Sequence, residues 1–142
     1  MKARHILVED CVYSHEMVRG MTGADNVLPI YLRAGVPVAI ATDDEGIVRS
    51  ELTWYFKRAV VGYHVDYGTL KRIVRDSLDH AFVLGASLWS APENFTMVGA
   101  CANDRLEPEP SSAGCRELLA GSERARLEWK EEVQFVRFEA QF

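Results

Sequence analysis

Hydrophobic and polar residues follow one another in an order that predicts strand, helix, strand and helix. Residues 5–12 are short and mostly β-favouring, and Ser14 directly after them is a candidate helix cap. Residues 36–42 are apolar almost throughout, which is typical of a strand covered on both faces of a parallel sheet. Between these strands, a short helix through Tyr31 is expected to end at Gly35. This order favours a parallel α/β sheet.

Amphipathic helices are predicted after the second strand. Apolar residues recur at three- and four-residue spacing over residues 52–63 and again over residues 70–82, where Asp66 is a candidate cap. Residues 118–136 predict one long terminal helix with Glu and Arg on its outer face. Two parallel strands alone bury little and leave both sheet edges open, so this chain needs a larger sheet beside it.

Composition and charge exclude several classes of function. The chain has 142 residues, 48% of them apolar, which suits a globular domain with a core. A complete (β/α) barrel takes about 200 residues or more, so the chain can hold only part of one. The net charge of −5 provides no broad basic surface for nucleic acid. No run reaches the roughly 20 apolar residues of a membrane helix, and the first residues lack a hydrophobic signal region, so we expect a cytoplasmic chain.

The cysteines show no zinc-site spacing. Cys11, Cys101 and Cys115 form no CxxC motif and no Cys/His cluster. We interpret them as buried thiols. The alternative is a Cys101–Cys115 bridge, because both residues flank a proline-rich loop, and a bridge would indicate that the parent protein is exported.

Two adjacent carboxylates, Asp43 and Asp44, follow the most apolar strand. The carboxyl ends of strands are where α/β barrels and open α/β sheets place catalytic and binding groups. Adjacent residues diverge as they leave a strand, so one carboxylate can bind a buried metal while the other faces a ligand. The alternative is that one of them caps a helix beginning near Val48, with Gly46 completing a turn.

Residues 35–46, Gly-Val-Pro-Val-Ala-Ile-Ala-Thr-Asp-Asp-Glu-Gly, resemble the final barrel strand of adenosine deaminases and the Thr-Asp-Asp or Ser-Asp-Asp turn after it. Residues 52–60, 70–82 and 85–89 are similar to the helices that follow this strand, most closely in the growth-factor-related branch with its bacterial members. The resemblance implies a C-terminal fragment of a (β/α)8 TIM-type barrel. Residues 1–90 would be the last two strands and their helices, and residues 91–142 a helical extension.

The same resemblance implies a site. In that family the first aspartate of the pair binds the catalytic zinc and orients its water, and the second hydrogen-bonds the purine ring. Asp43 would therefore be the metal ligand and catalytic residue, and Asp44 the substrate contact. The implied reaction is attack of metal-activated water on C6 of a purine nucleoside, with release of ammonia.

Most of the family's catalytic residues are missing from this chain. Its His-x-His, its further histidine ligand and its proton-transfer glutamate and histidine would all precede Met1. A lone aspartate does not hold zinc at useful affinity, so we expect no activity from the chain alone and a complementing N-terminal barrel segment as a partner. The alternative is a non-catalytic relative that self-associates through open strand edges or acts as an interaction protein.

Two short departures from the family pattern accompany this absence. The chain has Ser14-His15 where the family has Ser-Asn, and Asn26-Val27 where it has His-Pro. We interpret His15 as a surface or helix-start histidine, because histidine has many uses besides ligation. Its position after the neighbouring strand also leaves open that it reaches the Asp43 pocket.

Overall fold

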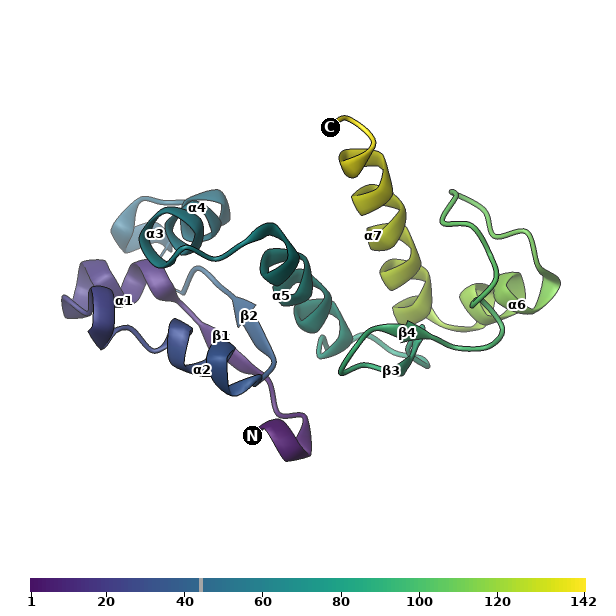
Figure 1. Cartoon of the computed structure of the whole chain (residues 1–142), viewed down its shortest axis with the longest axis horizontal. Coiled ribbons are helices and arrows are strands. Elements are labelled where there is room, and N and C mark those ends of the chain that lie inside the picture. Colours follow the sequence, from purple (N-terminus) through teal and green to yellow (C-terminus); the bar gives the residue numbers. More distant parts are fainter. Residues whose placement is uncertain (44) are drawn as a thin grey trace. The chain divides into compact units, whose positions relative to one another are not determined.

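A computed structural model describes residues 1–43 and 45–142 (Figure 1). The fold is mixed α/β and mostly helical. The chain divides into two compact units, Met1–Ser77 and Leu78–Phe142, and each has its own cluster of buried apolar side chains. Within the described residues, no helix combines the length and the apolar character needed to cross a membrane.

The first unit is built on two parallel strands. β1 (Val8–Asp10) pairs with β2 (Val38–Ile40), so that Asp10 lies opposite Ile40. Both predicted strands and their parallel order are confirmed, although each is shorter than the pattern indicated. The connection between them contains α1 (Val12–Arg19), a 3-10 turn (Gly23–Asp25) and α2 (Leu28–Ala34). α2 ends, as predicted, at Gly35 in the left-handed conformation with φ 65°.

The helices that come next after β2 are α3 (Glu45–Val48), α4 (Leu52–Tyr63) and α5 (Tyr67–Asp79). The predicted cap is confirmed, because Asp66 Oδ1 accepts the backbone N–H of Thr69 at 2.7 Å. The buried stripes are narrower than predicted. Leu52 is exposed, and Phe82 lies beyond the end of α5 and is exposed as well. The core of the unit consists of Val12, Leu28, Val38, Ile40, Tyr55, Ala59, Val65 and Ile73.

The second unit begins with an antiparallel hairpin that the sequence pattern did not predict. β3 (Trp89–Ala91) pairs with β4 (Thr96–Met97) with a register irregularity. Two helices follow, α6 (Ala113–Gly121) and α7 (Glu123–Glu139). The core of this unit consists of Leu88, Trp89, Cys101, Cys115, Ala125, Trp129 and Val133.

The prediction of one long terminal helix is wrong, because Ser122 separates α6 from α7. Ser122 is extended and caps α7 by accepting the backbone N–H of Ala125 at 3.1 Å. The same hydroxyl donates to the carbonyl of Ala86 at 2.6 Å. These two bonds hold the chain in a non-helical conformation where side-chain periodicity alone predicts continuity.

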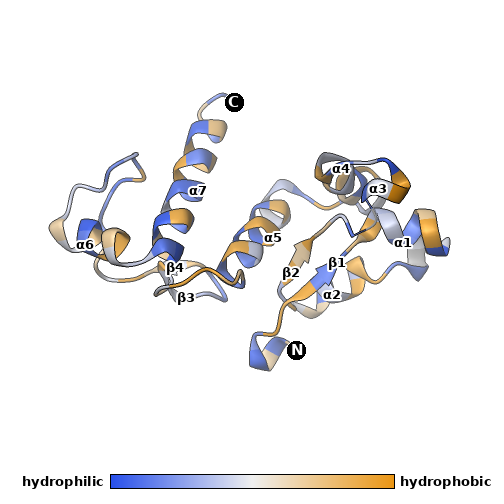
Figure 2. Ribbon diagram, turned by 180° about the vertical axis from the view of Figure 1, so that it is seen from behind, coloured by the Kyte–Doolittle hydropathy of each residue, from blue (hydrophilic) through white to orange (hydrophobic). Residues whose placement is uncertain are grey.

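The charged residues of α7 are also not confined to its outer face. Figure 2 shows hydrophobic and hydrophilic residues alternating along this helix. Glu128 and Glu132 are nevertheless buried, with exposed fractions of 0% and 2%. Simple hydropathy places every glutamate outside, so this part of the prediction is wrong.

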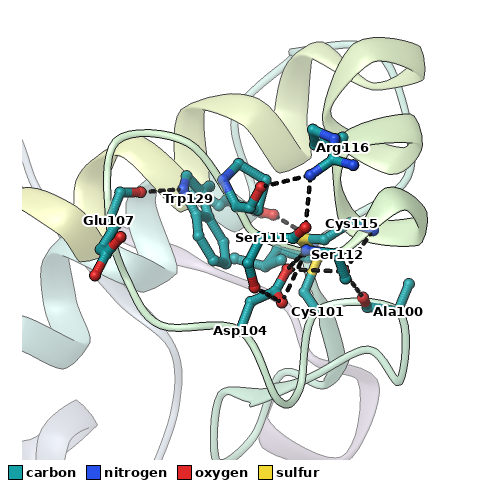
Figure 3. Close-up of a disulfide and its surroundings, with 12 residues drawn as sticks. Ala100, Cys101, Asp104, Glu107, Ser111, Ser112, Cys115, Arg116 and Trp129 are labelled. Carbon is teal, nitrogen blue, oxygen red and sulfur yellow. Dashed lines mark hydrogen bonds between the residues drawn. A yellow bond between two sulfur atoms is a disulfide. The ribbon is translucent and has the colours of Figure 1, made fainter.

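A disulfide joins Cys101 to Cys115 (Figure 3). Our interpretation of these residues as buried thiols is therefore wrong, and the alternative pairing holds. The loop between them folds back because Asp104 accepts hydrogen bonds from both Ser111 and Ser112. Ser112 also caps α6 through the backbone N–H of Cys115, which brings the two cysteines together. Cys11 is a half-buried residue outside this disulfide.

Candidate functional site

The predicted metal ligand, Asp43, lies three residues after the end of β2. Because β1 and β2 are parallel and in register, this is the edge of the sheet where β1 also ends, at Asp10. Asp43 is exposed and has a left-handed backbone with φ 51°. Asp44, the predicted substrate contact, lies outside the described residues. The roles of both aspartates stay predictions.

The residue before Asp43 is held by two helices. The carbonyl of Thr42 accepts hydrogen bonds from Ser14 Oγ of α1 at 2.8 Å and from the Tyr55 hydroxyl of α4. The prediction that Ser14 caps α1 is wrong. The helix begins at Val12 with Cys11 as its capping position, so Ser14 is a buried residue of its first turn. The segment between β2 and Asp43 is thus anchored by side chains of α1 and α4.

The alternative role for the aspartate pair was helix capping. The helix expected near Val48 begins at Glu45. The capping prediction for Asp44 falls on a residue outside the described range. Asp43 is one residue further from the helix, which leaves its exposed carboxylate at the carboxyl end of β2.

A second carboxylate at this edge, Asp10, was missed by sequence reasoning. Its side chain is fully buried, and Oδ1 lies 3.6 Å from Nδ1 of His15. Within the described residues, neither carboxylate oxygen of Asp10 nor Nδ1 of His15 has a hydrogen-bond partner. Burial raises the pKa of Asp10, and the nearby His15 opposes that rise. Asp10 lay inside the predicted strand of residues 5–12, and only the observed end of β1 at Asp10 places this carboxylate at the carboxyl end of a strand.

The opposite flank of α1 is tied to α4. Glu16 accepts hydrogen bonds from Arg58 Nε at 2.5 Å and from the Tyr63 hydroxyl. The hydrogen bond to Glu16 raises the pKa of Arg58, while burial is the larger cause of the raised pKa of Tyr63. A pocket of about 310 Å³ adjoins this group and includes Trp54 and Lys57 in its lining. Because Glu16 is occupied twice, we interpret it as a structural tie rather than a catalytic acid.

The second unit contains a buried acid, Glu128. It accepts the backbone N–H of Leu88 at 2.6 Å and the hydroxyl of Ser87 at 3.2 Å. Burial raises the pKa of Glu128 to about 7, against the opposing effect of the Leu88 hydrogen bond, and the charge of Asp79 raises it further. Arg124 donates to the carbonyls of Asp79, Ala81 and Val83. These contacts hold residues 79–88 against α7.

A groove of about 510 Å³ lies between α6, α7 and the proline-rich loop. Its apolar lining includes Pro110 of the proline-rich loop and Trp129 and Val133 of α7. Four cationic side chains and one carboxylate surround this lining: Arg116, Arg126, Lys130, Arg137 and Glu109. The groove is therefore locally positive on a chain that is negative overall.

No protein-family model matches the chain, and no curated protein or solved structure is significantly similar to it. Zinc needs nitrogen, sulfur or carboxylate ligands. At the carboxyl edge of the first unit, Asp43 and the Asp10–His15 pair supply donors of the right kind.

Proposed function

We propose that the chain is the C-terminal part of an adenosine deaminase-like, zinc-dependent hydrolase. The observation that carries the proposal is the position of Asp43 at the carboxyl end of β2, beside a parallel neighbour that precedes it in the chain. That is the arrangement expected of the last two strands of a (β/α)8 barrel. α4 and α5 overlap two of the three segments that resemble the family's helices, whereas residues 85–89 are not helical and end at the start of β3. In this proposal α6 and α7 are the helical extension.

Zinc bound at such a site supplies a water activated for attack at C6 of a purine nucleoside. Asp43 would hold the metal through its carboxylate and would orient the attacking water. Asp44 hydrogen-bonds the purine ring and orients it. Ser14 and Tyr55 contribute indirectly, because they fix the carbonyl that precedes Asp43. The remaining ligands and the proton-transfer groups come from an N-terminal barrel segment that pairs with the sheet of β1 and β2.

The first test is the DNA upstream of the Met1 codon. We expect an in-frame segment that encodes a His-x-His, and a stop codon or frameshift there would leave only a remnant of the enzyme. Alongside it, the purified 142-residue chain is assayed for ammonia release from adenosine. We expect no turnover above background, and turnover that depends on Asp43 would overturn the claim that the site is incomplete.

A second candidate function, an interaction protein, is favoured by the groove of the second unit. Its apolar lining with four cationic side chains and one carboxylate suits an acidic, amphipathic peptide segment of another protein. Trp129 lines the groove, so its fluorescence reports occupancy.

The test uses a labelled peptide of alternating glutamate and leucine residues. Binding should be lost in the double variant Lys130→Glu and Arg137→Glu, and retained in the control Arg19→Glu, which changes an exposed cation outside the groove. Equal binding by both variants would exclude the groove as the site.

The disulfide bears on where the protein works. Disulfides persist mainly in oxidising compartments. We therefore replace the expected cytoplasmic location with the proposal that the parent protein is exported, which agrees with the pairing of Cys101 and Cys115.

A further inference from the structure

Two buried ligand atoms face each other at the carboxyl end of β1. Asp10 Oδ1 and His15 Nδ1 lie 3.6 Å apart, and neither has a hydrogen-bond partner within the described residues. A buried carboxylate without a donor is strongly disfavoured in free energy. Such groups are rare in folded proteins and call for an ion, a water or a catalytic role to account for them.

The pair resembles the arrangement in which a carboxylate fixes the orientation of a metal-binding histidine ring. A separation of 3.6 Å is too long for a hydrogen bond, yet a small side-chain rotation would bring Nδ1–H within range. A histidine that binds a metal through one ring nitrogen commonly donates the other N–H to a carboxylate. Since Nδ1 of His15 faces Asp10, the opposite edge with Nε2 is the side that a ligand can meet. The side chain of His15 is 21% exposed, so it is accessible from solvent.

His15 belongs to the same end of the sheet as Asp43. Its neighbour Ser14 donates to the carbonyl of Thr42, the residue directly before Asp43. After Asp43 the chain continues into α3, which packs against α1. The chain therefore contacts α1, the helix of His15, both just before Asp43 and just after it.

We propose that His15 is a ligand, through Nε2, for a divalent transition metal such as zinc, and that Asp10 is the positioning residue that holds Nδ1–H. The inference deepens the proposed function and rests on it, because Asp43 is taken as the second ligand from this chain. It also gives a use to a departure from the family pattern, since this chain has His15 where the family has asparagine. The ionised carboxylate of Asp10 would make the imidazole a stronger ligand.

The test is titration of the 142-residue chain with Zn²⁺ alone by calorimetry, and with Co²⁺ alone by visible absorption. We expect saturable one-to-one binding by the wild type, and its loss in His15→Ala. Asp10→Asn should weaken affinity about 10- to 100-fold, because the amide keeps the shape of the carboxylate but not its charge. The control His64→Asn removes another histidine of the first unit at a left-handed position that asparagine tolerates, and should bind as the wild type does.

The outcomes separate this inference from the proposed function. Unchanged binding in His15→Ala overturns the inference, and if Asp43→Asn loses binding in the same series, the proposed role of Asp43 survives. Loss in His15→Ala with unchanged binding in Asp43→Asn supports His15 and removes Asp43 as a ligand. If Asp10→Asn loses binding as fully as His15→Ala, the ion is held directly by Asp10 and the positioning role is wrong.

A second measurement does not depend on metal affinity. Long-range ¹H–¹⁵N correlation spectra of the metal-free chain report which nitrogen of the neutral His15 ring carries the proton. We expect Nδ1 to be protonated in the wild type, and this preference to weaken in Asp10→Asn. A wild-type ring protonated on Nε2 would overturn the inference. Circular dichroism shows whether each variant is folded.

Discussion

The carboxylate of Glu128 accepts the backbone N–H of Leu88 at 2.6 Å, although forty residues separate the two along the chain. The contact places an ionisable group in the core of the second unit, with an exposed fraction of 0%. It also satisfies a backbone donor that would otherwise be buried without a partner. Glu128 therefore links α7 to the segment that precedes β3, and the link is sensitive to protonation.

This link predicts that stability falls as pH rises. The pKa of Glu128 is raised to about 7 in the folded chain from a usual value of 4.5. Between these values the folded state binds more protons than the unfolded state, so the stabilisation is full below pH 4.5 and is lost as pH rises through 7. Glu128→Gln should remove this pH dependence, which we expect to change the free energy of unfolding by on the order of 2 kcal/mol. Urea unfolding from pH 4 to 8 measures it, and the exposed Glu117→Gln is the control; an unchanged slope in Glu128→Gln would contradict the prediction.

Gly85 is predicted to tolerate no side chain. Its φ is 111°, and an added Cβ would lie 2.3 Å from Ser122 Oγ, the hydroxyl that caps α7. Gly85→Ala should therefore destabilise the chain by about 2 kcal/mol or more, because it combines backbone strain with a displaced cap. Gly99→Ala is the matched control, since a Cβ there meets nothing within 4 Å. Equal midpoints of unfolding for the two variants would show that the contact with Ser122 is not formed.

The disulfide is predicted to stabilise the second unit. Replacing Cys101 and Cys115 by serine should cost about 3 kcal/mol, the value expected from chain entropy for a closed loop of this length. Urea unfolding followed by tryptophan fluorescence measures the loss, and reductant should reproduce it in the wild type. Cys11→Ser is the control, and reductant should destabilise this variant as much as it destabilises the wild type. A wild type insensitive to reductant would contradict the pairing.

The anchor of Thr42 predicts non-additive effects. The hydroxyls of Ser14 and Tyr55 both lie within hydrogen-bond distance of its carbonyl and lie 2.6 Å from each other, so their two protons are shared among three contacts. Ser14→Ala or Tyr55→Phe alone should each cost about 1 kcal/mol, because one donor remains. The double variant leaves the carbonyl with neither side-chain donor and should cost more than the sum. A double-mutant cycle from urea unfolding tests this, and strictly additive values would argue against a shared acceptor.

Strands and helices with strong local patterns were predictable from the sequence. The apolar run that contains β2 and the caps at Gly35 and Asp66 were found because each depends on a few adjacent residues. The break at Ser122 was not found. It depends on a hydrogen bond to Ala86, thirty-six residues earlier in the chain, and side-chain periodicity contains no trace of that bond.

The candidate site was predictable only in part, for the same reason. Asp43 follows a recognisable strand, and its neighbourhood resembles a known turn. Asp10 ends a strand whose pattern is weaker, and its burial against His15 emerges only when α1 folds back over the sheet edge. Ser14 looked like a cap because its residue type suits one, but the register of α1 turned it toward Thr42.

The most direct test of the account is ammonia release from adenosine by the chain extended with the polypeptide encoded in frame before Met1. We predict zinc-dependent turnover that is lost in Asp43→Asn and retained in Asp25→Asn, which changes an exposed aspartate of the same unit. Turnover that persists in Asp43→Asn, or an extended, folded and zinc-loaded protein that releases no ammonia, would contradict the assignment of this sheet edge to a deaminase site.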